Sequence, residues 1–461
     1  MFETDTIAAI STALGNSGIH IIRISGEDSF SVIEKVFKKG KNKKTFNVDA
    51  VKSHTIHYGF IFYENEYIDE VMVSIYKAPN SYTKEDVVEI NCHGGSFVVK
   101  KILKILIKSG CRLAAPGEFS KRAFLNGRID LSQAEAVMDL IKSQNETALK
   151  SSLKQINGRL SDVIRDTREK LLHESAFIEA ALDDPEHFSL DDYAEGTLKK
   201  VISECRSDIK KLVETYEKGR IISEGIDTAI VGSPNAGKSS LLNNLLNDDK
   251  AIVTDIPGTT RDIIEHSVNI GRITLNLIDT AGIHDTEDVI EKIGIEKTFS
   301  SIDRAQLILI VIDIAKGVLD EDLLIYERIK DKPHVVVLNK SDISDDMCYD
   351  RAMFSGSRIV IYSTKTGTGY NELIEVITDM FYNNDIDVEN ELYITNVRHY
   401  ELLENALKSL DNVIGEINES VSEDMLTIDI MDAYMYLGEI IGETIDDDLV
   451  DKIFSEFCMG K

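Results

Sequence analysis

Residues 226–240 read IDTAIVGSPNAGKSS, an apolar stretch that runs into a glycine-rich motif. Gly232, Gly237, Lys238 and Ser239 have the spacing of a phosphate-binding loop. The glycines allow successive backbone N–H groups to point at phosphate, while Lys238 neutralises the β and γ oxygens and Ser239 offers a hydroxyl to Mg²⁺. Such a motif arises by chance in roughly a few per cent of chains of this length, so alone it is only a hypothesis of nucleotide hydrolysis.

Three further motifs follow in the order that a guanine-nucleotide switch needs. Asp279–Gly282 comes after an alternating apolar stretch and can reach Mg²⁺ and the γ-phosphate. Asp342, in the segment Asn339–Asp342, can accept two hydrogen bonds from the N1 and N2 edge of guanine, which adenine lacks. Ser363–Lys365 would complete the base pocket, although Thr364 stands where Ala is usual. Together these motifs predict a GTP site.

The elements that must position these motifs are short apolar strands separated by helical stretches. Each motif alone is ordinary loop chemistry, because Asp, Asn and Gly are common turn residues. Their shared order, each after an apolar strand, favours a parallel sheet with ligand loops at its carboxyl edge, a P-loop α/β GTPase domain. The expected strands lie at 228–231, 273–278, 307–312, 335–338 and 359–361.

The residue that positions water for hydrolysis does not follow the Ras-like pattern. Ile283 occupies the place of the usual glutamine and cannot hydrogen-bond a water. Nearby candidates are Asn235, the switch segment 254–262 and Glu291. A solvated helix carboxylate is the plainer interpretation of Glu291 from the residues alone.

Several separate strings resemble the MnmE (TrmE) family of bacterial and organellar tRNA-modification GTPases over essentially the whole chain. These strings are Asp5–Gly26, Pro116–Ile141, Ala251–His266, Asp279–Lys297 and the ending IFSEFCMGK.

The resemblance implies a GTPase in which K⁺ takes the place of an arginine finger. Asn235, Thr254, Ile256 and Thr259 would be the K⁺ ligands, and a cation there would stabilise the charge that develops on the phosphoryl oxygens. Thr260 would join Ser239 on Mg²⁺. Glu291 matches the family's catalytic glutamate and would act with Lys238 and Asn235. Ser233 and His284 stand where the family usually has arginine.

The full GTP-binding set combines these motifs with the resemblance. Its members are Asn235, Ala236, Gly237, Lys238, Ser239, Ser240, Thr254, Asp255, Ile256, Pro257, Gly258, Thr259, Thr260, Asp279, Thr280, Ala281, Gly282, Asn339, Lys340, Asp342, Ser363, Thr364 and Lys365.

Residues 1–118 contain apolar and alternating stretches at 19–24, 56–62, 71–76 and 87–90 that predict an α/β or mixed-sheet domain. The resemblance implies that this domain binds a reduced folate such as 5-formyltetrahydrofolate and mediates dimerisation. The matching folate positions are Arg23, Glu89, Arg128 and Lys461, with Arg128 where the family often has Lys. An ordinary surface ion pair is the alternative for Arg23 and Glu89, and His93 with its two following glycines reads as a turn rather than a metal site.

Residues 119–222 and 383–461 read as helical on either side of the GTPase domain, 223–382. Ser132 and Glu135 have the spacing of a capping box, and apolar stripes follow at 160–172 and 402–414. The resemblance implies that the two helical parts pack as one domain into which the GTPase domain is inserted. Near the end of the chain, Met459 replaces the Ile that is usual in the family. Two interpretations of Cys458 remain: a buried thiol that only packs, or a residue with a catalytic or accessory role near the folate site.

Composition narrows the class of protein. The chain has 461 residues, enough for about three domains, and five scattered cysteines that form neither a disulfide framework nor a zinc pattern. The acidic start lacks the basic region of a signal peptide, and no apolar run is long enough to span a membrane. We therefore expect a cytoplasmic protein.

The net charge of −29 argues against a protein that holds RNA unaided, because phosphate neutralisation supplies most non-specific affinity. The basic cluster at 38–44 is interpreted as a solvated loop. By resemblance, a homodimer would form a heterotetramer with the flavoprotein MnmG (GidA), which would bring FAD, NADH and most contacts to tRNA. Together they would add an aminomethyl or carboxymethylaminomethyl group to C5 of the wobble uridine.

Two other functions remain open at this point. One is a ribosome-assembly GTPase that binds RNA and forms no covalent product. The other is a folate-dependent methyltransferase with a regulatory GTPase, for which the flavoprotein would not be required.

Overall fold

The described residues fall into two compact units. The first consists of 1–138, 161–168 and 435–461, and the second of 139–160 and 169–434. The computed structural model describes residues 5–183, 193–246, 264–271, 273–278, 299–343, 351–382, 391–419, 423–444, 447–457 and 460.

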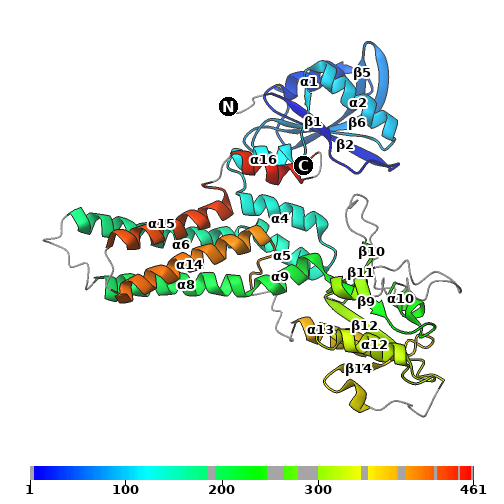
Figure 1. Ribbon diagram of the computed structural model, residues 1–461. Helices are drawn as coiled ribbons and strands as arrows, with labels where there is room; N and C mark the ends of the chain where they lie inside the picture. The colour runs from blue at the N-terminus through cyan, green and yellow to red at the C-terminus, as the bar shows by residue number, and fades with distance from the viewer. Residues whose placement is uncertain are drawn as a thin grey trace. The chain divides into compact units, whose positions relative to one another are not determined.

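The first unit is built on an eight-stranded sheet with strand order β4-β3-β5-β6-β7-β2-β1-β8. Neighbouring strands are antiparallel except β1 and β8. Helices α1 (Ser29–Val36) and α2 (Ser96–Ser109) cover one face, where the apolar core lies (Figure 1). The four strands that the sequence predicts are confirmed as β2, β5, β6 and β7. The strands are β1 (Ile7–Ile10), β2 (Ile19–Ser25), β3 (Phe37–Lys39), β4 (Lys44–Thr45), β5 (Thr55–Tyr63), β6 (Glu66–Tyr76), β7 (Val87–His93) and β8 (Arg112–Leu113).

Three helices continue this unit: α3 (Glu118–Leu125), α4 (Leu131–Lys142) and α16 (Asp447–Ser455). The predicted capping box at Ser132 and Glu135 is wrong. Asp130 caps α4 instead, because its Oδ1 accepts from the N–H of Gln133 at 3.0 Å while its own N–H donates to Gln133 Oε1 at 2.9 Å. Ser132 is already inside the helix, where its hydroxyl supports the cap by donating to Asp130 and also lies within hydrogen-bond distance of Ser161 Oγ.

The long helices predicted from the apolar stripes lie mainly in the second unit, although residues 161–168 and 435–441 of two of them belong to the first (Figure 1). Helix α8 lies along α14, and each buries one apolar side. Among the described residues, no helix is long and apolar enough to cross a membrane. The helices are α5 (Glu146–Ile156), α6 (Arg159–Asp183), α8 (Lys199–Glu214), α9 (Tyr216–Glu224), α14 (Val397–Glu419) and α15 (Glu423–Ile441), with a π-helical turn at Ala194–Leu198.

The same unit contains a six-stranded sheet of order β10-β11-β9-β12-β13-β14. Apolar cores lie on both faces, with α10 (Lys238–Leu246) and α13 (Tyr370–Tyr382) on one and α12 (Asp320–Ile329) on the other. All five predicted strands are present, but β10 is an additional antiparallel edge strand, paired with β11 through a turn at Gly271. The strands are β9 (Ile226–Val231), β10 (Ile264–Ile270), β11 (Ile273–Ile278), β12 (Leu307–Asp313), β13 (His334–Asn339) and β14 (Arg358–Ile361).

The two chain segments that flank this sheet meet within the helical part. The N–H of Ile394 donates to Thr215 Oγ1 at 3.1 Å. Gly219 lies so close that an added Cβ would be 2.1 Å from the carbonyl oxygen of Ile394. A GTPase fold is therefore inserted into a helical domain, and only glycine fits where the two segments touch.

Candidate nucleotide and folate sites

The phosphate loop connects β9 to α10 and depends on glycine at two positions. Gly232 has φ +144°, and an added Cβ would be 2.2 Å from the carbonyl oxygen of Val311. Gly237 has φ +104°, and its Cβ would be 2.1 Å from Asn339 Nδ2. Larger residues would push the loop off the neighbouring strands, so the sequence motif reflects a steric requirement.

Lys238 is held over the phosphate loop by its own backbone. Its ammonium donates to the carbonyl oxygens of Gly232 at 3.0 Å and Ser233 at 2.9 Å. Burial lowers the pKa of Lys238, and the nearby Asp322 carboxylate partly opposes that shift. Asp322 is fully buried and accepts from the N–H of Ser233 at 3.0 Å, so a carboxylate from α12 fixes the loop behind the lysine.

Asn339 joins the phosphate loop to the base-recognition loop. Its Nδ2 donates to the carbonyl oxygen of Ala236 at 2.8 Å, and its Oδ1 accepts from the N–H of Thr364 at 3.1 Å. Asn244 of α10 adds a second link by donating to the carbonyl oxygen of Thr364 at 2.9 Å. The structure thus brings three separate sequence motifs to one edge of the sheet.

The side chains predicted to recognise the base are held in place by contacts within the protein. Ser363 Oγ donates to Asp342 Oδ1 at 2.7 Å, and Lys365 Nζ lies 3.8 Å from the same carboxylate. The hydrogen bond from Ser363, with Lys365 nearby, lowers the pKa of Asp342. Asp342 is therefore an ionised acceptor, the state that the N–H donors of guanine require.

Two residues of the site adopt left-handed backbone that is uncommon outside glycine: Asn235 with φ +61° and Lys340 with φ +68°. They are tied together, because Lys340 Nζ donates to the carbonyl oxygen of Asn235 at 3.0 Å and pairs with Asp313 Oδ2 at 2.6 Å. Such strain persists where surrounding contacts over-determine it, which is typical of ligand sites. The side chain of Asn235 is exposed at the loop surface.

Ser239 and Ser240 begin α10 beside Lys238, as the motif predicts. The other predicted GTP, Mg²⁺ and K⁺ residues lie outside the described residues: Thr254, Asp255, Ile256, Pro257, Gly258, Thr259, Thr260, Asp279, Thr280, Ala281, Gly282 and Glu291.

Sequence reasoning missed Asp313, Asp322 and Asn244. Asp313 is the last residue of β12, at the carboxyl edge of the sheet. It could have been predicted in the same way as Asp279, because both follow an apolar strand. Asp322 follows Asp320 and Glu321 at the start of a helix. Acidic residues at that place are usually exposed to solvent, so the sequence gives no sign that Asp322 is buried. Nothing in the sequence pattern distinguishes Asn244.

Three of the four predicted folate residues, Arg23, Glu89 and Arg128, lie close together on the first unit. Arg23 donates from Nε to Glu89 Oε1 at 2.9 Å, the ion pair that the plainer interpretation also expects. The guanidinium carbons of Arg23 and Arg128 lie 5.2 and 4.7 Å from the ring centre of Tyr82. Tyr82, which the sequence argument did not include, thus joins the two arginines.

Lys461 lies outside the described residues, but its neighbour Gly460 is placed. The carbonyl oxygen of Gly460 accepts from Ser11 Oγ at 3.0 Å, next to β1. In the register of the sheet, β1 pairs with β2, the strand of Arg23. The carboxyl-terminal segment therefore reaches the same part of the unit as the folate residues.

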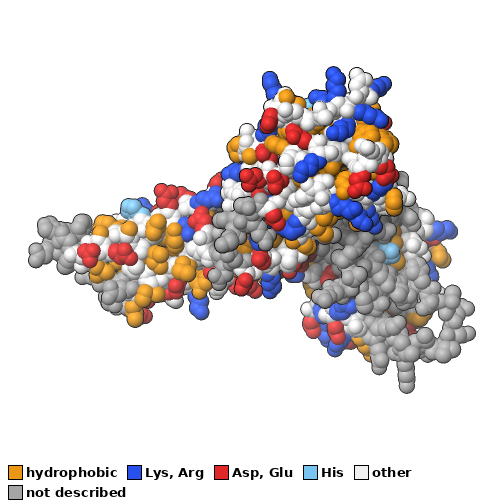
Figure 2. Space-filling model, turned by 90° about the horizontal axis from the view of Figure 1, so that it is seen from above, with side chains coloured by type: hydrophobic (Ala, Val, Ile, Leu, Met, Phe, Trp, Pro, Cys, Tyr) orange, Lys and Arg blue, Asp and Glu red, His pale blue; other side chains and the backbone are white. Residues whose placement is uncertain are grey.

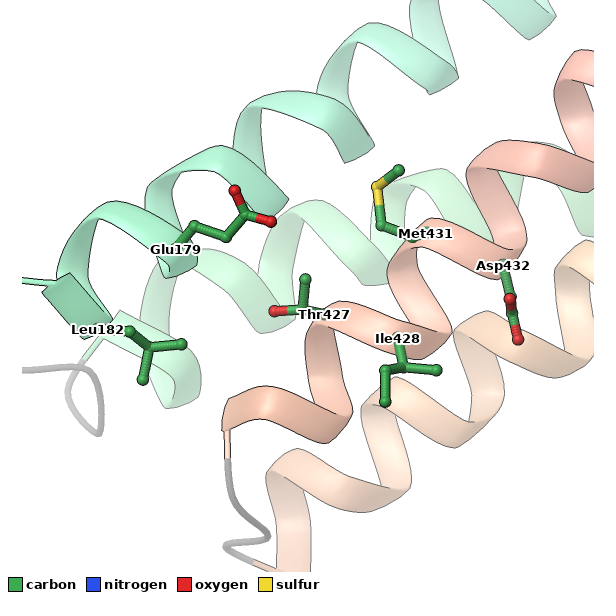
Figure 3. Close-up of a pocket in the computed structure, with 6 residues that line it drawn as sticks. All are labelled: Glu179, Leu182, Thr427, Ile428, Met431 and Asp432. Atoms are coloured by element: carbon green, nitrogen blue, oxygen red, sulfur yellow. The ribbon is translucent and has the colours of Figure 1, made fainter. Parts of the chain in front are cut away.

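An open pocket of about 410 Å³ lies between α6 and α15 (Figure 3). It contains none of the predicted site residues. Two carboxylates and a mostly apolar surface form its walls: Glu179, Leu182, Thr427, Ile428, Met431 and Asp432.

Comparison with known proteins identifies the family of the chain. One family model, GTP-binding protein TrmE N-terminus, matches residues 6–128, and another, MnmE helical domain, matches residues 131–458. The tRNA modification GTPase MnmE of Lachnoclostridium phytofermentans is 50% identical over 461 residues, and that of Acetivibrio thermocellus is 46% identical over 465, each covering 100% of both chains. Among solved structures, Aquifex aeolicus Era bound to GDP and AlF4⁻ aligns at 28% identity and TM-score 0.26, over 40% of this chain and 66% of that chain. The chain belongs to the MnmE (TrmE) family of tRNA modification GTPases.

Proposed function

We propose that this protein is a K⁺-dependent GTPase that acts with a flavoprotein partner to modify C5 of the wobble uridine in certain tRNAs. The observation that carries the nucleotide half is the double role of Asn339, whose amide joins the phosphate loop to Thr364 beside the Asp342 carboxylate. This arrangement can recognise phosphate and guanine together.

In the proposed site, Lys238 binds the β and γ oxygens, and burial supports this role because a buried ammonium gains most from an anionic partner. Ser239 and Thr260 would hold Mg²⁺, and Asn235, Thr254, Ile256 and Thr259 would hold K⁺. The exposed side-chain oxygen of Asn235 is a suitable hard ligand. Bound K⁺ would supply positive charge where charge develops during phosphoryl transfer. Glu291 would orient the attacking water.

The proposal that the protein binds a folate rests on the residues that lie together around Tyr82, namely Arg23, Glu89 and Arg128. Glu89 can accept from the amidine edge of a pterin ring, while Arg128 and Lys461 can bind the glutamate tail. Tyr82 offers a ring on which a flat heterocycle can stack. We propose that 5-formyltetrahydrofolate or a related reduced folate binds there and delivers the carbon unit.

Family membership supports a proposal for the wider assembly. A homodimer formed through the domain 1–118 would form a heterotetramer with the flavoprotein MnmG, which would bring FAD, NADH and most contacts to tRNA. The helical segments 119–222 and 383–461 would enclose the GTPase domain 223–382. The ribosome-assembly alternative is less well supported, because the family models also match the amino-terminal and helical parts.

The test is GTP hydrolysis by the purified protein in KCl and in NaCl at equal ionic strength, with the Asn235→Ala and Glu291→Ala variants. We expect strong activation by K⁺ that disappears in Asn235→Ala, and loss of hydrolysis with retained nucleotide binding in Glu291→Ala. Asn243→Ala, an exposed change on α10, is the matched control and should behave as wild type. Equal rates in the two salts would exclude the K⁺ role.

A further inference from the structure

The basic cluster at 38–44 is an ordered hairpin at the edge of the first sheet. β3 and β4 pair antiparallel, with Lys39 opposite Lys44, and β4 is the last strand of the sheet. Lys39, Lys41, Lys43 and Lys44 are exposed and Lys38 is half-buried. The interpretation of this segment as a loop is therefore wrong in part, because strand pairing fixes where the lysines lie.

Several other lysines of the chain have acidic partners. Lys101 pairs with Glu66 at 2.8 Å and Lys330 with Glu327 at 2.7 Å. Within the described residues, no carboxylate lies within ion-pairing distance of the hairpin lysines. In a chain with 80 acidic and 51 basic residues, this concentration of unneutralised positive charge requires an explanation.

Aromatic rings border the hairpin instead. The ammonium of Lys43 lies 4.8 Å from the ring centre of Phe62, and Lys38 is the cross-strand partner of Phe60. Tyr67 lies next to both of these rings, at 5.8 and 5.9 Å, and is half exposed. Lysines interleaved with accessible rings form the kind of surface that binds a sugar-phosphate backbone and its bases.

The positive charge of the hairpin affects the pKa of a neighbouring histidine. The pKa of His57 is lowered by burial and, in addition, by the charge of Lys39. Figure 2 shows Lys and Arg side chains interspersed with Asp and Glu side chains over the face in view. An anionic ligand at the hairpin would relieve this local repulsion.

We propose that the β3–β4 hairpin is a tRNA-binding surface at which Lys38, Lys39, Lys41, Lys43 and Lys44 contact phosphates. This inference rests on the proposed function, which supplies tRNA as the substrate. The phosphate contacts of the lysines position the tRNA without reading its sequence. The protein then contributes its own RNA contacts instead of relying wholly on a partner.

The test measures binding of an unmodified tRNA transcript to the full-length protein across a range of KCl concentrations. A triple variant, Lys41→Glu, Lys43→Glu and Lys44→Glu, should bind at least tenfold more weakly. The slope of log affinity against log salt should fall by about 2 to 3, since each phosphate contact contributes roughly 0.7 to 0.9. The corresponding Lys→Arg triple variant should bind as wild type, because charge is retained.

The matched control is Lys200→Glu, Lys210→Glu and Lys211→Glu on α8, which changes the net charge equally. This control should bind tRNA as wild type. Equal weakening in both variants, or an unchanged salt slope in the hairpin variant, would overturn the proposal. So would a hairpin variant that loses only binding to the flavoprotein, since the surface would then bind protein.

GTP hydrolysis is measured on the same preparations to separate the two proposals. We expect the hairpin variant to hydrolyse GTP with unchanged K⁺ dependence. Loss of K⁺ dependence in the wild type would contradict the proposed GTPase mechanism but not the tRNA surface. Normal hydrolysis without any effect of the hairpin on tRNA binding would contradict only the tRNA surface.

Discussion

Asn339 uses both ends of its amide inside the protein. It holds the carbonyl oxygen of Ala236 and the N–H of Thr364, and it is fully buried. Asp342, three residues later, has its carboxylate oriented by Ser363. At the scale of single residues, one side chain joins two loops of the site, and a neighbouring carboxylate is held where we propose that it binds the base.

Asp342→Asn should change which base is bound. The amide replaces an acceptor with a donor opposite N1 of guanine, so GTP affinity should fall by about 2–3 kcal/mol, roughly 30- to 150-fold, while xanthosine triphosphate gains affinity. Competition with a fluorescent GDP analogue measures both. Asp331→Asn, the same chemical change at an exposed position, is the control. Unchanged preference for guanine would contradict the assignment of Asp342.

His93 provides a pH-dependent prediction. Its Nδ1 lies 2.6 Å from Asp69 Oδ1, and this hydrogen bond raises the pKa of His93. The pair stabilises the folded state below the ordinary imidazole pKa, and this stabilisation is lost as pH rises through the raised value. NMR titration should show that Asp69→Asn lowers the pKa of His93 and leaves that of His57 unchanged. A pKa of His93 that does not respond to this change would refute the pairing.

At the scale of helices and strands, hydrogen bonds at the ends of an element fix its position as much as the packing of its apolar face does. Asn145 caps α5 by accepting from the N–H of Ala148 at 2.8 Å, and its amide donates to Thr274 Oγ1 of β11 at 2.9 Å. β11 ends at Ile278, one residue before the predicted Mg²⁺-site residue Asp279. This cap therefore joins the helical part to the strand that leads into a nucleotide motif.

Asn145→Ala should lower the free energy of unfolding by about 1 kcal/mol through the lost cap, with a further loss from the bond to Thr274. Asn145→Asp is the control, because its carboxylate keeps the cap but cannot donate to Thr274. Urea denaturation of the two variants separates the contributions. Equal stability of Asn145→Ala and wild type would show that the cap is unimportant.

Strand periodicity and motif order were sufficient to predict the GTPase fold, because each apolar strand is followed by its own polar loop. They did not predict β10, whose pairing depends on a turn at Gly271. The capping box of α4 was wrong because Asp130 and Gln133 offer the same chemistry two residues earlier. Asp322 and Tyr82 could not be predicted, since their roles come from contacts between segments far apart in the sequence.

At the scale of the whole molecule, residues near the carboxyl end of the chain pack against residues of its amino-terminal part. Gly117 lies so close to α16 that an added Cβ would be 2.4 Å from the carbonyl oxygen of Phe454. Gly460 rests on β1, where a Cβ would be 2.3 Å from the carbonyl oxygen of Ile10. The proposed folate site thus draws on both ends of the sequence.

Gly460→Ala should displace the carboxyl-terminal segment and weaken binding of 5-formyltetrahydrofolate at least tenfold, because Lys461 would move with it. GTP hydrolysis should be unchanged. Gly356→Ala is a matched control, since its φ of +89° is close to the +88° of Gly460 but an added Cβ meets nothing within 4 Å. Fluorescence titration with the folate measures both variants. Normal folate affinity in Gly460→Ala would remove Lys461 from the site.

The insertion also sets the order in which a ribosome can complete the protein. The predicted GTPase segment, 223–382, is continuous in sequence, so all of its strands are translated before α14 and α15. The helical segments on either side must wait for α14 and α15, and the sheet made first receives its last contact, at Gly460, when almost the whole chain has been translated. Translation therefore starts with the amino-terminal sheet, then the helical part, then the GTPase segment, and it completes them in the reverse order. The amino-terminal sheet, which is started first, is completed last.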